Sequence, residues 1–140
     1  MAKFILTDGY VEINGVDLSD HAHNLDTPQT RTRVDVSGFN STGASEFLSG
    51  AREDAATIGF RQNTATSKVH QTLSPLFQNS STFGFSIRFT SGAVSATNPR
   101  YWGTASLFTY NGLSGERNDV GEVVAELSAA TATGFVWATS

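Results

Sequence analysis

Two histidines separated by one residue are the first side chains whose types and spacing suggest chemistry. His21 and His23 would share one face of a strand, because strand side chains repeat every two residues. With the carboxylate of Asp17 or Asp20 beside them, a metal site is conceivable. Histidines in such a place more often cap or line a surface, so we expect no metal there.

The sequence lacks the motifs of the common enzyme classes. It has no cysteine, which excludes disulfide scaffolds, zinc ribbons and thiol nucleophiles. It contains neither a dinucleotide or phosphate-binding glycine loop nor the G-x-S-x-G elbow of serine hydrolases. The early aspartates could suggest calcium, but their spacing matches no EF-hand loop. We therefore predict a protein that is not an enzyme and has no catalytic, cofactor-binding or metal-binding residues.

The charge balance argues against a protein that grips DNA. The chain of 140 residues has a formal net charge of -4 and only 9 basic residues, which are scattered without a run. Binding to DNA requires clustered Lys and Arg that neutralise phosphates. A protein past which DNA slides remains compatible with this composition. Only 16% of the residues are charged, which fits a surface largely buried against copies of itself.

The length indicates a single domain over residues 1–140. No apolar stretch approaches the roughly 18 residues that span a bilayer. The apolar run near the N-terminus is too short for the core of a signal peptide. We therefore expect no membrane association and a cytosol-like compartment.

Alternating apolar and polar residues predict a mainly β protein. The clearest strand is residues 83–89, where every odd position is apolar. Val11 and Ile13 precede the turn pair Asn14-Gly15, which predicts an early hairpin. The same pattern predicts strands at residues 30–36, 55–61, 101–110, 120–127 and 135–137.

One segment has the apolar spacing of a helix. Its apolar residues are Val69, Leu73, Leu76 and Phe77, and Thr66 or Ser67 could be its N-cap. Pro75 would remove an interior hydrogen bond. We expect about two turns, or a helix broken near Pro75.

Residues 37–53 are predicted to form a long loop between two strands. The stretch is rich in glycine and serine, yet it carries Phe39, Phe47 and Leu48. Long loops in compact domains are usually functional or disordered, and exposed large apolar residues usually mark a contact surface. The alternative is a mobile loop whose apolar residues fold back onto the core.

Three segments in order resemble the major tail tube proteins of long, flexible-tailed phages. They are VEINGVDLSDH at residues 11–21, TLSPL at 72–76 and AVSATNPRYWGTA at 93–105. The order of elements is also similar: an early hairpin, a strand, a long loop, a strand, a helix, and then three or four strands. The resemblance covers most of the chain, although the loop at residues 37–53 departs from it in detail.

The resemblance implies a small β-sandwich or barrel with one flanking α-helix and a long inter-strand loop. Six subunits would form a ring around a channel, and rings would stack into a phage tail tube that conducts DNA during ejection. The implied partners are other copies of the chain, a tape-measure protein, and tail terminator and tail-tip proteins, with DNA passing transiently. The protein would assemble in the host cytoplasm and reside in the virion tail, without a cofactor.

Two sets of residues acquire expected roles from this resemblance. The expected inter-ring contact residues on and beside the long loop are Phe39, Phe47, Leu48 and Arg52. Strands 30–36 and 55–61 are expected to pair and to turn one polar face to the lumen, with Arg31, Arg33, Asp35, Thr57 and Arg61. Their apolar faces would pack on the core through Val34, Val36, Ile58 and Phe60. In the alternative, that polar face is the outer surface of a sandwich.

Two other functions also fit the sequence. A tail terminator or head-tail connector on the same fold would form single rings and would not polymerise. A carbohydrate-binding β-sandwich module would display exposed aromatic side chains, and the candidates are Tyr101, Trp102 and Trp137. Electron micrographs separate tubes from rings, and a glycan array tests the third function.

Overall fold

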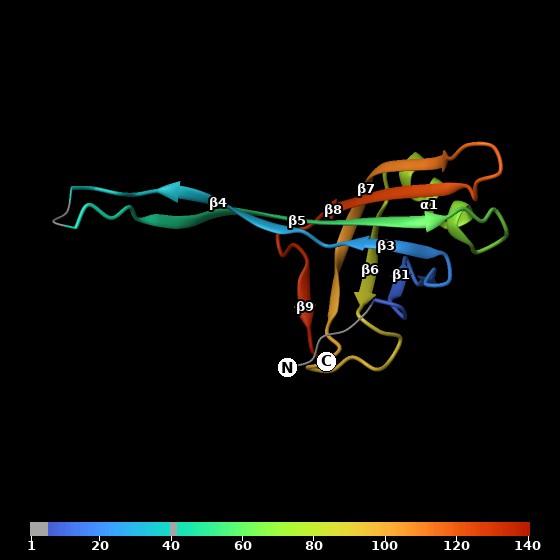
Figure 1. Cartoon of the computed structure of the whole chain (residues 1–140), viewed down its shortest axis with the longest axis horizontal. Helices are drawn as coiled ribbons and strands as arrows, with labels where there is room; N and C mark the ends of the chain where they lie inside the picture. The colour runs from blue at the N-terminus through green and yellow to red at the C-terminus, as the bar shows by residue number, and fades with distance from the viewer. Residues whose placement is uncertain (1–5, 40–41) are drawn as a thin grey trace.

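The computed structural model describes residues 6–39 and 42–140, and it is mainly β with one helix (Figure 1). The predicted fold class is confirmed. In chain order the elements are β1 (Tyr10–Ile13), β2 (Val16–Asp17), β3 (Ala22–Asp26), β4 (Gln29–Asp35), β5 (Phe47–Arg61), α1 (Val69–Gln78), β6 (Thr82–Arg88), β7 (Arg100–Ser114), β8 (Glu122–Ala129) and β9 (Val136–Ala138). No helix in the described ranges has the length and apolarity needed to cross a membrane.

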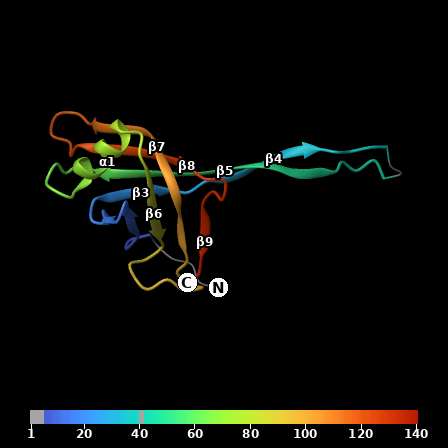
Figure 2. The same cartoon turned by 180° about the vertical axis from the view of Figure 1, so that it is seen from behind.

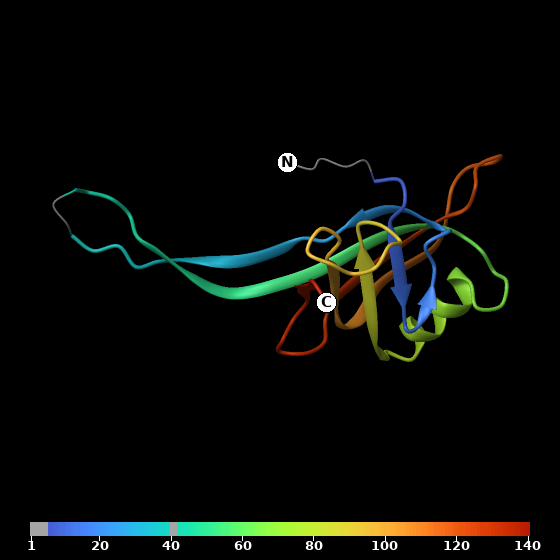
Figure 3. The same cartoon turned by 90° about the horizontal axis from the view of Figure 1, so that it is seen from below.

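The strands form one antiparallel sheet that folds over on itself at β7. Its order is β2-β1-β6-β7-β8-β5-β3, with β4 added to β5 and β9 added to β7. The first half of β7 pairs with β6 and β9, whereas its second half pairs with β8. As a result β1, β6 and β9 run across the direction of β3, β5 and β8 (Figures 1 and 3). The two layers make the predicted small sandwich, and α1 packs against β7.

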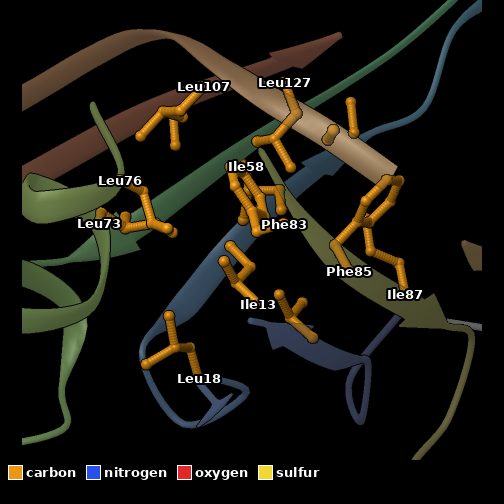
Figure 4. Close-up of a cluster of buried hydrophobic side chains, with 14 of the residues drawn as sticks. Ile13, Leu18, Ile58, Leu73, Leu76, Phe83, Phe85, Ile87, Leu107 and Leu127 are labelled. Carbon is orange, nitrogen blue, oxygen red and sulfur yellow. The ribbon is translucent and has the colours of Figure 1, made fainter. Parts of the chain in front are cut away.

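The hydrophobic core lies between these layers (Figure 4). Alternate residues of the strands in the sandwich point inward, as the period of two requires. On β6 these are Phe83, Phe85 and Ile87, and on β5 they are Ala56, Ile58 and Phe60. The rings of Phe85, Tyr101 and Phe135 meet edge-on, with centroids 4.5 to 5.8 Å apart.

The early hairpin is confirmed. Asn14 and Gly15 both have positive φ, 52° and 81°, as the two central residues of a type I′ turn require. The turn sets Ile13 opposite Val16, and the 0% exposure of Ile13 shows that this register buries the predicted apolar face.

The predicted helix is present and differs from its prediction at its start. It continues through Pro75 to Gln78, so the alternative of a break near Pro75 is excluded, and its 10 residues make nearly three turns rather than about two. Burial of Val69, Leu73 and Leu76 against the core anchors the helix on both sides of the proline and offsets the missing hydrogen bond. The N-cap is Lys68, which has no side-chain capping bond, rather than Thr66 or Ser67.

Most of the predicted long loop is strand. β5 begins at Phe47, so the connection covers residues 36–46, within which 40 and 41 lie outside the described residues. The predicted pairing of residues 30–36 with 55–61 is also wrong, because β4 pairs with Phe47 to Asp54 instead. The reason is that the second half of β5 already has both edges occupied, by β3 and by β8.

Gly103 on β7 makes room for the ring of Phe135. A Cβ atom at this position would lie 2.6 Å from Phe135 Cδ1 and 3.0 Å from the Gly134 carbonyl oxygen. Gly103→Ala should therefore lower the free energy of unfolding by about 1–3 kcal/mol, measured by urea denaturation. Gly84→Ala on the paired strand β6 is the matched control, since its Cβ would meet only one atom, at 4.0 Å. Equal stability of the two variants would contradict this account.

Candidate functional site: the β4–β5 arm and the outer face of the sheet

A two-stranded arm extends from the body of the molecule. It consists of β4 and the first half of β5, and it projects well beyond the sandwich in opposite views (Figures 1 and 2). Beyond the strands, Val36 N donates to Glu46 O at 3.0 Å and Glu46 N donates to Ser37 Oγ at 2.7 Å. Every residue of β4 is exposed, so the arm has no core of its own. An isolated two-stranded ribbon is marginally stable in water, and such a ribbon usually gains stability from a partner.

The arm carries exposed apolar side chains along its length. These exposed apolar side chains are Val34, Val36, Phe39, Phe47 and Leu48. The guanidinium of Arg33 lies 4.2 Å from the centre of the Phe47 ring, a cation–π contact on the surface. Three of the four residues expected to contact another ring are exposed, with Phe47 and Leu48 on opposite faces of the arm and Phe39 in the connection beyond its strands. Val34 and Val36 are exposed here and do not pack on the core, because β4 lies outside the sandwich.

Arg52, the fourth of these residues, lies at the root of the arm and is engaged within the chain. Its Nη2 atom lies 2.8 Å from Asp54 Oδ2, and it donates to the carbonyl oxygen of Thr133 at 2.7 Å. The Asp54 side chain is 2% exposed. Its carboxylate also accepts hydrogen bonds from Phe135 N at 2.9 Å and from Gln29 Nε2 at 3.2 Å. This cluster, the root cluster of Gln29, Arg52, Asp54 and Phe135, ties both strands of the arm to the segment before β9.

Asp54 was missed by the sequence analysis although a signal was present. It precedes Ala56, Ile58 and Phe60 in steps of two, which places it on the buried face of the same strand. A carboxylate on a buried face needs hydrogen-bond donors, and these come from sequence positions far away.

The five expected lumen residues do not share one face. From Asp26 to Arg31 the chain keeps one register against β5, with Asp26 opposite Thr57, Gln29 opposite Asp54 and Arg31 opposite Arg52. Alternation therefore puts Arg31 on the face of Asp54, and Arg33 and Asp35 follow it along β4. Thr57 and Arg61 belong to the opposite face. The predicted common polar face is wrong because β4 pairs with the arm half of β5.

The outer face of β3, β5 and β8 is polar and acidic. Thr57 lies between Asp26 on β3 and Glu126 on β8. Arg61 pairs with Glu122 at 2.5 Å, with side chains 47% and 46% exposed. In the described part of the chain, neither Asp26 nor Glu126 has a basic partner within ion-pair distance. Two uncompensated carboxylates thus flank Thr57 on this face.

The histidines of the opening hypothesis do not form a metal centre. Among the described residues there is no group of three or more side chains able to hold a metal ion. His21 Nε2 is buried without a hydrogen-bond partner, and the His23 ring lies beside Gly59.

The candidate sugar-binding aromatics are also separated. Tyr101 is fully buried and donates its hydroxyl to the Ala55 carbonyl oxygen at 3.0 Å, and burial raises its pKa. Trp137 packs on Tyr101, whereas Trp102 is the next residue on β7 and points to the other face of the sheet. The three rings therefore form no common platform.

The root cluster yields a stability prediction. Asp54→Asn keeps the shape but removes the charge that balances Arg52, and it should lower the free energy of unfolding by about 2 kcal/mol. Hydrogen exchange should also quicken in β4. Glu122→Gln, which breaks the exposed ion pair with Arg61, is the control and should change stability by less than about 0.5 kcal/mol. Two variants with equal stability in thermal unfolding would show that the root cluster does not hold the arm.

Comparison with known proteins identifies solved structures that share this fold. No family model and no curated protein matches the sequence. Solved structures do match its fold. A chain from the virion of a native gene transfer agent particle has a TM-score of 0.73 and 13% identity, covering 93% of this chain and 95% of that one.

Two further solved structures come from phage-like tails. A chain of the tail of an empty gene transfer agent particle, with C6 symmetry, has a TM-score of 0.67 and 14% identity, covering 84% of this chain and 81% of that one. The SPP1 tail tube has a TM-score of 0.70 and 11% identity, covering 95% of this chain and 77% of that one. At such low identity the likeness concerns the fold alone. The chain therefore has the fold of phage tail tube proteins.

Proposed function

We propose that this protein is a structural subunit of a tail tube, in which copies form rings that stack around a channel for DNA. The observation that carries the proposal is the arm, which combines exposed apolar side chains with the tail tube fold. A marginal ribbon of this kind requires a partner surface, and a second copy of the chain supplies one in a repeating assembly.

The ring is proposed to contain six subunits that each act as one domain over residues 1–140. The C6 symmetry of the gene transfer agent tail supports this number. Among the described residues the sheet ends at β3 and β2, and these edges would supply backbone groups for pairing between neighbours. The proposed location is the virion tail after assembly in the host cytoplasm, and the proposed role is structural rather than enzymatic. A tape-measure protein, a tail terminator and tail-tip proteins are the further proposed partners.

The outer face of β3, β5 and β8 is proposed to line the channel. Its uncompensated Asp26 and Glu126 would repel DNA phosphates and keep the duplex from adhering to the wall. Thr57 and Arg61 keep their expected place in the lumen. Arg31, Arg33 and Asp35 are instead assigned to the arm, since β4 carries them on the other face.

The arm is proposed to join successive rings. Phe39, Phe47 and Leu48 would make the contact, and Arg52 would orient the arm from the root cluster. The apolar side chains are assigned to the contact because they are exposed on the outer part of the arm. Arg52 is assigned to positioning because its side chain is hydrogen-bonded within the chain at the base of the arm.

Shortening the arm tests its role in stacking. Replacing residues 33–50 with an Asn-Gly turn joins Thr32 to Ala51 and leaves Arg52 in place. The variant should unfold cooperatively but form only rings or free subunits in electron micrographs, whereas the wild-type chain forms long tubes. Gly84→Ala, whose arm is intact, should form tubes of normal length. Tubes from the shortened variant would exclude the arm as the stacking element, and single rings from the wild-type chain would favour a terminator or connector.

Cysteine labelling tests the lumen face, since the chain has no native cysteine. Thr57→Cys should react with a maleimide carried on a bulky polymer in free subunits but not in finished tubes. A small maleimide, which can enter the channel, should label both forms and thus serves as the control. If the polymer labels tubes and subunits equally, this face lies on the outside.

A further inference from the structure

Two arginines lie side by side on the outer face of the layer that contains β1, β6 and β9. Arg88 on β6 is directly opposite Arg100 on β7, and Tyr10 on β1 is opposite Arg88 on its other side. The residues that alternate with the two arginines, Ile87 and Tyr101, are buried in the core, so both guanidiniums belong to the outer face. Like charges directly opposite each other destabilise a sheet unless another group neutralises them.

No carboxylate in the described part of the chain neutralises this arginine pair. Neither Arg88 nor Arg100 has an acidic side chain within ion-pair distance there. The Nε atoms of both are buried without a hydrogen-bond partner. Glu12, on the same face, instead accepts a hydrogen bond from the Tyr10 hydroxyl at 3.4 Å. Two adjacent positive charges thus stand without an acidic partner in a chain whose net charge is -4.

Aromatic rings hold both guanidiniums in place. Arg88 Cζ lies 3.9 Å from the centre of the Tyr10 ring, and Arg100 Cζ lies 4.7 Å from the centre of the Trp102 ring. Stacking on a ring leaves the terminal N–H groups of an arginine free to donate in its plane. A group fixed before binding also loses little conformational entropy when a ligand docks. The arginine pair is therefore suited to an oxyanion, whose oxygens match the arginine fork.

A hollow of about 280 Å³ adjoins the arginine pair. Its lining includes Arg100 and Trp102 together with the polar side chains of Glu12, Asn14 and Ser86. The Trp102 side chain is 39% exposed. An exposed indole beside carboxylate, amide and hydroxyl groups offers both an apolar surface and hydrogen-bond partners. A sugar ring, which is apolar on its faces and hydroxylated at its edge, uses both.

The carboxylates beside the hollow favour a saccharide over a nucleic acid. Glu12 lines the hollow, and Asp17 lies opposite Glu12 on β2. A nucleic acid strand carries one negative charge for about every 3.4 Å of helix axis, so phosphates next to a bound one would meet these carboxylates. A saccharide has neutral hydroxyls between its charged groups, and these donate hydrogen bonds to a carboxylate.

The face with the arginine pair points away from the proposed channel. The core lies between the two layers, so this face and the outer face of β3, β5 and β8 are on opposite sides of the subunit. With the second face lining the channel, the arginine pair lies on the outer wall of the tube, once in every subunit. Such repetition strengthens the binding of a polymer to sites that are individually weak.

We propose that Arg88 and Arg100 form an oxyanion site for an acidic saccharide, whose sugar rings carry sulfate, phosphate or carboxylate groups. The two guanidiniums bind the oxyanion, and the attached sugar ring lies in the hollow beside Trp102. The site itself belongs to a single subunit, and only its placement on the outer wall rests on the proposed function.

Calorimetric titration of free subunits tests the site, with a sulfated heparin tetrasaccharide as the probe. Arg88→Gln and Arg100→Gln should each weaken binding about tenfold, because each removes a charged hydrogen-bond donor to the oxyanion. Arg117→Gln is the matched control, since it removes the same charge from the exposed turn before β8 and should change the affinity less than about twofold. Arg88→Lys with Arg100→Lys, which keeps the charge but not the planar fork, should also weaken binding, and it replaces a glutamine variant that does not fold.

Three comparisons on free subunits separate the possible ligands. Equal binding by the wild-type chain and the variants at positions 88 and 100 would overturn the site. Inorganic sulfate that binds as tightly as the tetrasaccharide would show a simple anion site and overturn the saccharide assignment. Single-stranded DNA of equal charge that binds as tightly as the tetrasaccharide would overturn that assignment as well.

Retention of assembled tubes on immobilised heparin tests the placement on the outer wall. Wild-type tubes should be retained, and tubes of Arg100→Gln should elute at lower salt. Subunits that bind heparin while tubes do not would show that assembly buries this face, which overturns the placement and leaves the tail tube function standing. If the wild-type chain forms no tubes, the proposed function fails, while the titration of subunits still decides the site.

Discussion

The direction of the arm depends on one buried carboxylate, that of Asp54. Three polar groups from three parts of the chain converge on it: the guanidinium of Arg52, the side-chain amide of Gln29 and the backbone N–H of Phe135. Removing such a hub leaves several desolvated groups without partners, which is more costly than losing a single surface contact. The segment that Asp54 holds also contributes Phe135 to the aromatic cluster of the core. The root of the arm and the core of the body are therefore parts of one packed unit.

β5 performs two tasks with one continuous strand. Its second half is an inner strand of the body, with β3 and β8 on its edges and Ile58 and Phe60 in the core. Its first half has only β4 as a neighbour and presents both faces to solvent. The change occurs at Asp54, where burial ends. An assembly surface on a strand that continues into the core is positioned more accurately than one on a free loop, which is the advantage of this arrangement for the proposed stacking of rings.

Local sequence patterns predict the parts of this fold whose structure depends on interactions between neighbouring residues. The alternation in β6 and the Asn14-Gly15 turn are read correctly because each depends on neighbouring residues. Pro75 misleads, since buried leucines on both sides outweigh a local preference. The strand at Phe47 to Glu53 has no clear alternation and becomes a strand only through its pairing with β4. The hydrogen-bond donors to Asp54 come from distant positions, so no single segment predicts them. The expected lumen residues fall on two different faces for the same reason, because the register between β4 and β5 is set by long-range pairing.

The unbroken course of β5 has a mechanical consequence for an assembled tube. A load that pulls two rings apart would pass from the arm into the body along one covalent strand. The hydrogen bonds to β4 lie across that strand and would have to fail together in shear. Between Arg31 and Arg33 the register shifts, and bulges of this kind locally bend and twist a ribbon. In the proposed tube, the arm would thus resist extension along β5 and bend at this register shift, which would let a tail curve without lengthening.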